Sequence, residues 1–110
     1  MISNEQLDQM LESSPAERVT KEYMQGRITT TTFTRIGATM THCLITLDNG
    51  FGVTGESACV NVENYNQEIG EKIAYDNAFA KLWPLFGFLL AEHYKNTAEA
   101  HAFIKLTASE

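Results

Sequence analysis

The hydrophobic pattern of the chain changes from a helical period to a period of two at Arg27, and the new period persists to Gly55. This stretch is rich in β-branched side chains, which favour extended strands. Gly37-Ala38 and Asp48-Asn49-Gly50 interrupt it as turn sequences. Consecutive strands joined by short turns predict an antiparallel meander, with strands at residues 27–36, 39–47 and 51–55.

The length of the second turn decides which side chains share a face of the sheet, because a shift of one residue exchanges the two faces. A two-residue loop at Asn49-Gly50 would mix polar and apolar side chains on both faces. A three-residue loop that includes Asp48 places Leu47 opposite Phe51 and Ile45 opposite Val53. We therefore predict the three-residue loop, with Gly50 in the left-handed conformation of a bulge.

The first turn sets the remaining pairs. A two-residue type II′ turn at Gly37-Ala38 pairs Thr32 with Cys43 and places Phe33 across from His42. The predicted core face is then Ile28, Thr30, Thr32, Thr34, Ile36, Thr41, Cys43, Ile45, Leu47, Phe51 and Val53. The predicted opposite face carries Arg27, Thr29, Thr31, Phe33, Arg35, Met40, His42, Leu44 and Thr46.

Two helix-start signals precede the strands. Ser3 and Gln6 have the spacing of a capping box, which predicts a short helix from Ser3 to about Ser13. Ser14-Pro15 predicts the start of a second helix, with Ser14 as the N-cap and Pro15 at the first helical position. This helix is expected to run to about Gln25, where Gly26 ends it.

A longer helix follows the strands, after a connector. Asn61 or Asn66 caps it, and it runs to about Trp83, where Pro84 kinks or interrupts it before it continues to Tyr94. Asn96-Thr97 predicts the start of a last short helix. The prediction is a single α+β domain over residues 1–110: a three-stranded antiparallel meander packed against a long Pro-kinked helix, with short peripheral helices at 1–14 and 95–110.

Composition restricts the class of protein. The chain has 110 residues, a net charge of −6 and two cysteines. We expect no membrane span, because no run is long and apolar enough, and no signal peptide at the N-terminus. The acidic balance argues against binding to a nucleic-acid backbone, which relies on clustered Lys and Arg. Two cysteines without an export signal indicate a reducing cytoplasm.

No arrangement of residues predicts catalysis. The sequence Gly55-Glu56-Ser57-Ala58-Cys59 is not the Gly-x-Ser-x-Gly elbow, because Cys59 stands at the last position. His42, His93 and His101 have no Cys or carboxylate at metal-ligand spacing. We therefore expect no catalytic residue, no metal and no cofactor.

Two surfaces are candidates for binding. The first is the outer sheet face, a predicted interface made by Phe33, Arg35, Met40, His42 and Leu44, unless a terminal helix covers it. The second is the junction of the third strand, the connector and the long helix. Its candidate ligand-binding residues are Thr54, Glu56, Ser57, Asn77, Lys81 and Trp83. In the alternative interpretation Asn77 is structural and bonds the connector backbone.

The chain resembles a family of small tailed-phage proteins named after gene products of coliphage N4 and Shigella phage Sf6. The resemblance covers about residues 15–90 and departs where Asn61-Val62 replaces the Asp-Pro that many members have ahead of the helix. The residues that carry it are Leu47-Asp48-Asn49-Gly50-Phe51, Gly55-Glu56-Ser57-Ala58-Cys59, Asn64-Tyr65, Ile69-Gly70, Ala74-Tyr75, Asn77-Ala78, Leu82-Trp83-Pro84-Leu85 and Gly87.

The resemblance implies a phage accessory protein made in the cytoplasm of an infected bacterium. With no catalytic arrangement, we expect a non-enzymatic binder that modulates a host component. That component is a host protein, or a small signalling molecule held at an oligomer interface, and the chain itself is expected to form a homo-oligomer. The alternatives are a virion or assembly protein that acts by self-association, and a small enzyme or nucleic-acid-metabolism accessory.

Overall fold

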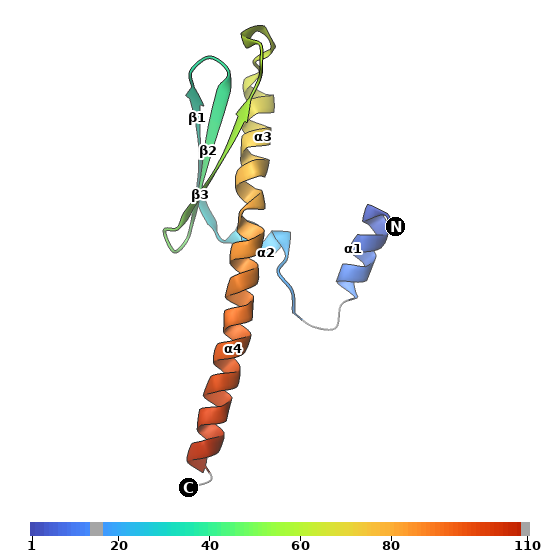
Figure 1. Ribbon diagram of the computed structural model, residues 1–110, viewed down its shortest axis with the longest axis vertical. Helices are drawn as coiled ribbons and strands as arrows, with labels where there is room; N and C mark the ends of the chain where they lie inside the picture. The colour runs from blue at the N-terminus through green and yellow to red at the C-terminus, as the bar shows by residue number, and fades with distance from the viewer. Residues whose placement is uncertain (14–16, 109–110) are drawn as a thin grey trace.

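The computed structural model describes residues 1–13 and 17–108, with side chains through residue 98. A three-stranded antiparallel sheet in the order β1-β2-β3 packs on one face against α3, which confirms the predicted α+β fold (Figure 1). Helix α4 continues past the end of the sheet, and α1 stands apart from the other elements. The elements are α1 (Asn4–Glu12), α2 (Lys21–Gly26), β1 (Ile28–Ile36), β2 (Met40–Leu47), β3 (Gly52–Ala58), the 3-10 turn η1 (Val62–Asn64), α3 (Gln67–Ala80) and α4 (Leu82–Ala108).

The first helix begins as predicted and the second does not. In α1 the Ser3 hydroxyl accepts the N–H of Gln6, and the Gln6 side chain accepts the N–H of Ser3, so the capping box is complete. The predicted helix over 14–25 is wrong at residues 17–20, which are not helical. Thr20 is extended there, and its side chain accepts the N–H of Tyr23 as the N-cap of α2. The signals at Ser14 and Pro15 lie outside the described residues.

The second hairpin has the predicted register. Ile45 pairs with Val53, and the Leu47 N–H donates to the Phe51 carbonyl oxygen over 2.8 Å. Gly50 has a φ of +88°, the left-handed conformation that the three-residue loop requires.

The predicted register of the first hairpin is wrong by one residue. Its loop is Gly37-Ala38-Thr39, because the Thr39 carbonyl oxygen accepts the N–H of Cys59 over 3.0 Å and Thr39 does not pair with β1. Phe33 consequently pairs with Cys43, and Thr34, not Phe33, pairs with His42. Residues Thr31, Phe33 and Arg35 therefore lie on the helix side, and Thr30, Thr32, Thr34 and Ile36 lie on the open side, the reverse of the prediction.

The core lies between the sheet and the helices. Small residues in α3 allow close contact: a side chain at Gly55 would collide with the α3 backbone at Ala74 and Ala78. A Cβ at Gly70 would lie 2.6 Å from the Thr41 hydroxyl oxygen. The buried apolar residues are Met24, Cys43, Ile45, Leu47, Val53, Ala74, Ala78, Phe79, Leu82 and Phe86.

The predicted interruption of the long helix is confirmed near Pro84. Helix α3 ends at Ala80 and α4 begins at Leu82. Proline has no N–H to donate to the Ala80 carbonyl and its ring crowds that carbonyl, which accounts for the break. The predicted new start at Asn96-Thr97 is wrong, since α4 continues through it. Among the described residues, no helix is long and apolar enough to cross a membrane.

Candidate functional site

The open face of the sheet presents three apolar side chains to solvent. Ile36, Met40 and Leu44 are 46%, 36% and 36% exposed. Helix α3 packs on the opposite face, and no residue of α1 is buried, so the terminal helix that could have covered this surface does not (Figure 1). Beside them the His42 Nε2 lies 3.7 Å from a Glu56 carboxylate oxygen. We call Ile36, Met40, His42 and Leu44 the open-face patch.

The structure divides the predicted interface between the two faces of the sheet. Met40, His42 and Leu44 lie on the open face, as expected. Phe33 and Arg35 lie on the helix side, as a consequence of the shifted first hairpin. The Arg35 guanidinium there lies 3.8 Å from the centre of the Tyr65 ring and donates to the Ala38 carbonyl over 2.7 Å.

Two of the predicted ligand-binding residues hold β3 against α3. The Ser57 hydroxyl donates to the Gly70 carbonyl over 2.7 Å. The Asn77 side-chain amide donates to the Glu56 carbonyl over 2.8 Å. These contacts correspond to the structural interpretation of Asn77, with a strand backbone as its partner.

The other predicted ligand-binding residues do not gather around these two. Thr54 pairs with Leu44, and the Glu56 carboxylate approaches His42, which places both side chains on the open face. Lys81 and Trp83 are exposed at the junction of α3 and α4, where Trp83 packs edge-on against Phe79 at 6.4 Å between ring centres. The six residues therefore do not line a shared cavity.

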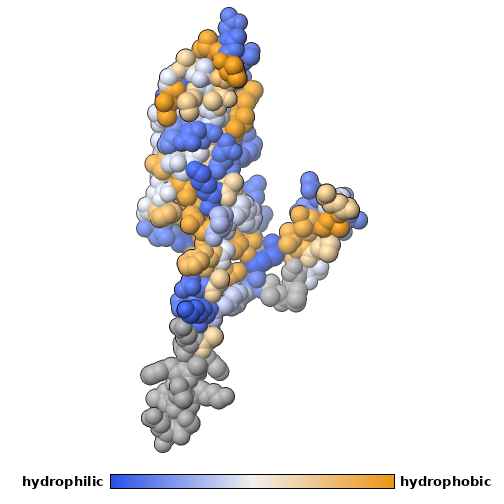
Figure 2. Space-filling model, in the orientation of Figure 1, coloured by the Kyte–Doolittle hydropathy of each residue, from blue (hydrophilic) through white to orange (hydrophobic). Residues whose placement is uncertain are grey.

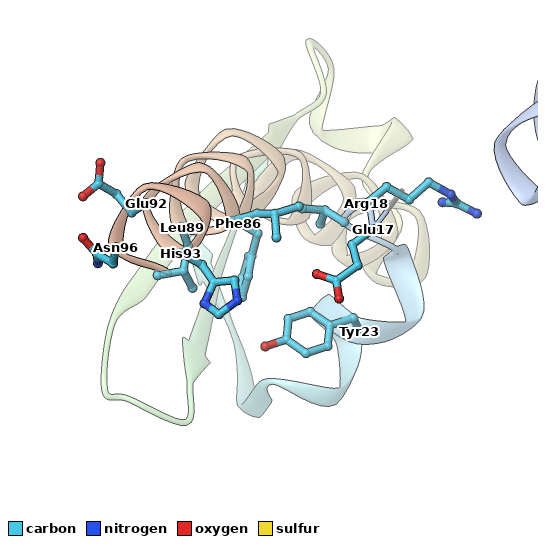
Figure 3. A pocket seen from close by; sticks show the side chains of 10 residues that line it. Glu17, Arg18, Tyr23, Phe86, Leu89, Glu92, His93 and Asn96 are labelled. Atoms are coloured by element: carbon cyan, nitrogen blue, oxygen red, sulfur yellow. The ribbon is translucent and has the colours of Figure 1, made fainter. Parts of the chain in front are cut away.

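A groove that the sequence did not predict lies between residues 17–20, α2 and α4 (Figure 3). Its volume is about 600 Å³. Tyr23 and Phe86 meet edge to face at 5.9 Å, and Tyr23 and His93 point into the space between the helices (Figure 3). The lining residues are Glu17, Arg18, Val19, Tyr23, Phe86, Leu89, Leu90, Glu92, His93 and Asn96.

Among residues 1–13 and 17–98, no group of His, Cys, Asp and Glu side chains is placed to hold a metal ion. Burial raises the pKa of the Cys43 thiol, which keeps this side chain neutral within the core. The hydrogen bond that the Arg27 Nε donates to the Asp48 carboxylate over 2.8 Å raises the pKa of Arg27.

Comparison with known proteins gives one match. The model of the phage protein (N4 Gp49/phage Sf6 gene 66) family matches residues 4–94. This range includes α1 and all the groove-lining residues of α4 except Asn96, and so extends beyond the 15–90 of the resemblance. No curated protein and no solved structure matches the chain.

Proposed function

The chain belongs to the phage protein (N4 Gp49/phage Sf6 gene 66) family, and from that premise we propose that it is a non-enzymatic accessory protein that binds a host protein. The binding takes place in the cytoplasm of the infected cell and modulates the host protein. The observation that carries this proposal is the open-face patch. Its apolar side chains remain exposed on the face of the sheet opposite the core.

The shape of the patch favours a protein partner. A sheet face is broad and nearly flat, whereas sites for small molecules are concave and enclose most of their ligand. Exposed apolar side chains gathered on one surface of a small protein are typical of a protein contact. The patch also combines apolar contact with a His42–Glu56 pair at its side, a mixture of apolar and polar groups that protein interfaces share.

Affinity capture tests this function. The tagged protein is retrieved from lysate of infected host cells, and both proteins and small molecules in the eluate are identified by mass spectrometry. The wild-type chain should retain one host protein in stoichiometric amount, and the double variant Met40→Lys/Leu44→Lys should lose it. The control is Ile69→Lys, which places one lysine at an apolar residue of α3 that is also exposed.

Three results would contradict the proposal. A nucleotide or other metabolite in place of a host protein would establish a small-molecule binder. Equal capture by the double variant would show that the open-face patch is not the contact. Retention of nothing but further copies of the chain, together with abundance in purified particles, would establish the assembly role.

A further inference from the structure

Helix α1 has an amphipathic sequence but little structure to pack against. It has nine residues, and none of them is buried. Its apolar side chains Leu7 and Leu11 are 43% and 38% exposed, and Figure 2 shows apolar residues gathered on this part of the molecule. Isolated helices shorter than about 12–15 residues are marginal in water. A helix of this length with a complete capping box therefore requires a docking surface.

The groove has the dimensions and chemistry that α1 requires. Its wall on α4 extends from Phe86 to Asn96, about 15 Å at 1.5 Å per residue, and α1 is about 14 Å long by the same measure. The floor supplies apolar and aromatic surface at Val19, Tyr23 and Leu89. An amphipathic helix that lays its apolar side into such a groove is a common mode of protein recognition.

The position of α1 directs it away from the groove of its own chain. The Arg18 Nε donates to the Leu11 carbonyl over 2.9 Å, which fixes the C-terminal end of α1 beside the groove rim. From that point α1 extends outward and lies apart from α4 (Figure 1). In this arrangement no residue of α1 lines the groove of its own chain, so that groove is open to another molecule.

We infer that α1 of one copy docks in the groove of a second copy, and that the exchange is reciprocal, so that the chain forms a closed dimer. A reciprocal two-fold contact satisfies both grooves and leaves no open end for further growth. A nine-residue helix about 10 Å across buries roughly 250–300 Å² of its own surface and a similar area of the groove that it enters. Two helices and two grooves together therefore bury on the order of 1,000 Å². That area is the lower limit for a specific interface.

The oligomeric state, measured by size-exclusion chromatography with light scattering across a concentration series, tests the exchange. The wild-type chain should have twice its mass of 12.3 kDa. The double variant Leu7→Glu/Leu11→Glu should weaken association by about tenfold or more, since it removes two apolar anchors. The control Gln9→Glu adds one negative charge on the opposite side of α1 and should stay dimeric.

A mixing experiment identifies the second copy as the occupant. Leu89→Glu damages the groove and should also give monomers. When this variant is mixed with Leu7→Glu/Leu11→Glu, one intact arm meets one intact groove, and a tagged copy of either should capture the other. Circular dichroism verifies that each variant is folded.

The inference is overturned if the wild-type chain is monomeric at every concentration, whether its own α1 or nothing fills the groove. Dimers that persist in Leu7→Glu/Leu11→Glu would place the self-contact on another face. Failure of the two variants to associate on mixing would also overturn it.

Discussion

At the scale of single residues, Gly55 determines how closely the sheet approaches α3. The groups that a Cβ would meet there are backbone atoms of Ala74 and Ala78, which cannot rotate away. Gly55→Ala should therefore destabilise the fold by about 1–3 kcal/mol, as overpacking does. Urea denaturation measures this change. The control is Gly87→Ala in α4, where a Cβ meets nothing within 4 Å, and it should stabilise by about 0.5–1 kcal/mol. Equal stability of the two variants would contradict the close contact between Gly55 and the backbone of α3.

Asn77 provides a second test at this scale. Its side chain is exposed and makes a hydrogen bond of 2.8 Å to the Glu56 carbonyl. Asn77→Ala should lower the free energy of unfolding by about 0.5–1.5 kcal/mol, the net value of such a bond. Lys81→Ala, at an exposed position beside it, should change stability by less than about 0.5 kcal/mol. If Asn77→Ala instead removes host binding at unchanged stability, the residue has a binding role.

Cys43 gives the fold a dependence on alkaline pH. Burial raises the pKa of its thiol in the folded chain, so the unfolded chain loses the proton first as pH rises. Its contribution to stability is therefore full below the ordinary thiol pKa of about 8.5 and declines above it. Chemical denaturation of wild type and Cys43→Ala at several pH values should show a steeper decline in the wild type. Identical slopes in the two chains would refute the assignment.

At the scale of elements, the two hairpins show what the sequence can and cannot determine. In the second hairpin, the three-residue loop places Ile45, Leu47 and Val53 on one face, and that register is the observed one. In the first hairpin, Thr29–Thr32 supplies the same side chain to both faces. Its register depends instead on a bond between Thr39 and Cys59, which are distant in sequence. The sequence of side chains along the first hairpin therefore did not indicate the length of its loop.

The candidate surfaces also differ in whether the local sequence pattern could indicate them. Met40, His42 and Leu44 were predicted on the open face, because they belong to the strand whose register the second hairpin fixes. The groove was not predicted, because it joins residues 17–23 to residues 86–96 and no local pattern connects those segments. The apolar side chains at Phe86, Leu89 and Leu90, beyond the end of the sheet, were the one available signal.

The second hairpin loop also supports a quantitative prediction. Gly50 has a φ of +88° with open space around its Cα, so the cost of a side chain there is conformational alone. Gly50→Ala should destabilise the chain by about 1–2 kcal/mol. Gly26→Ala is the control, because its surroundings are equally open and its φ is not positive. The midpoint temperature of thermal unfolding measures both changes. If the two substitutions lower it to the same extent, the left-handed conformation of Gly50 is contradicted.

At the scale of the whole molecule, the chain is extended. Its radius of gyration is 19.8 Å, compared with about 13 Å for a compact domain of this length. The excess comes from α4, which continues past the sheet, and from α1, which stands apart (Figure 1). These projecting elements carry the groove and the arm of the inferred dimer, while the open-face patch lies on the sheet. The two contacts therefore occupy separate surfaces, and one can fail without the other.

Methionine methyl groups report directly on the proposed contact between the open-face patch and a host protein. Met40 lies in the patch, and Met24 is fully buried in the core. In the NMR spectrum of the protein carrying ¹³C-labelled methionine methyls, adding extract of infected host cells should shift the Met40 signal or weaken it selectively. The Met24 signal should change less, and Leu44→Lys should abolish the effect. A Met40 signal that is unchanged while the host protein is bound would contradict the account.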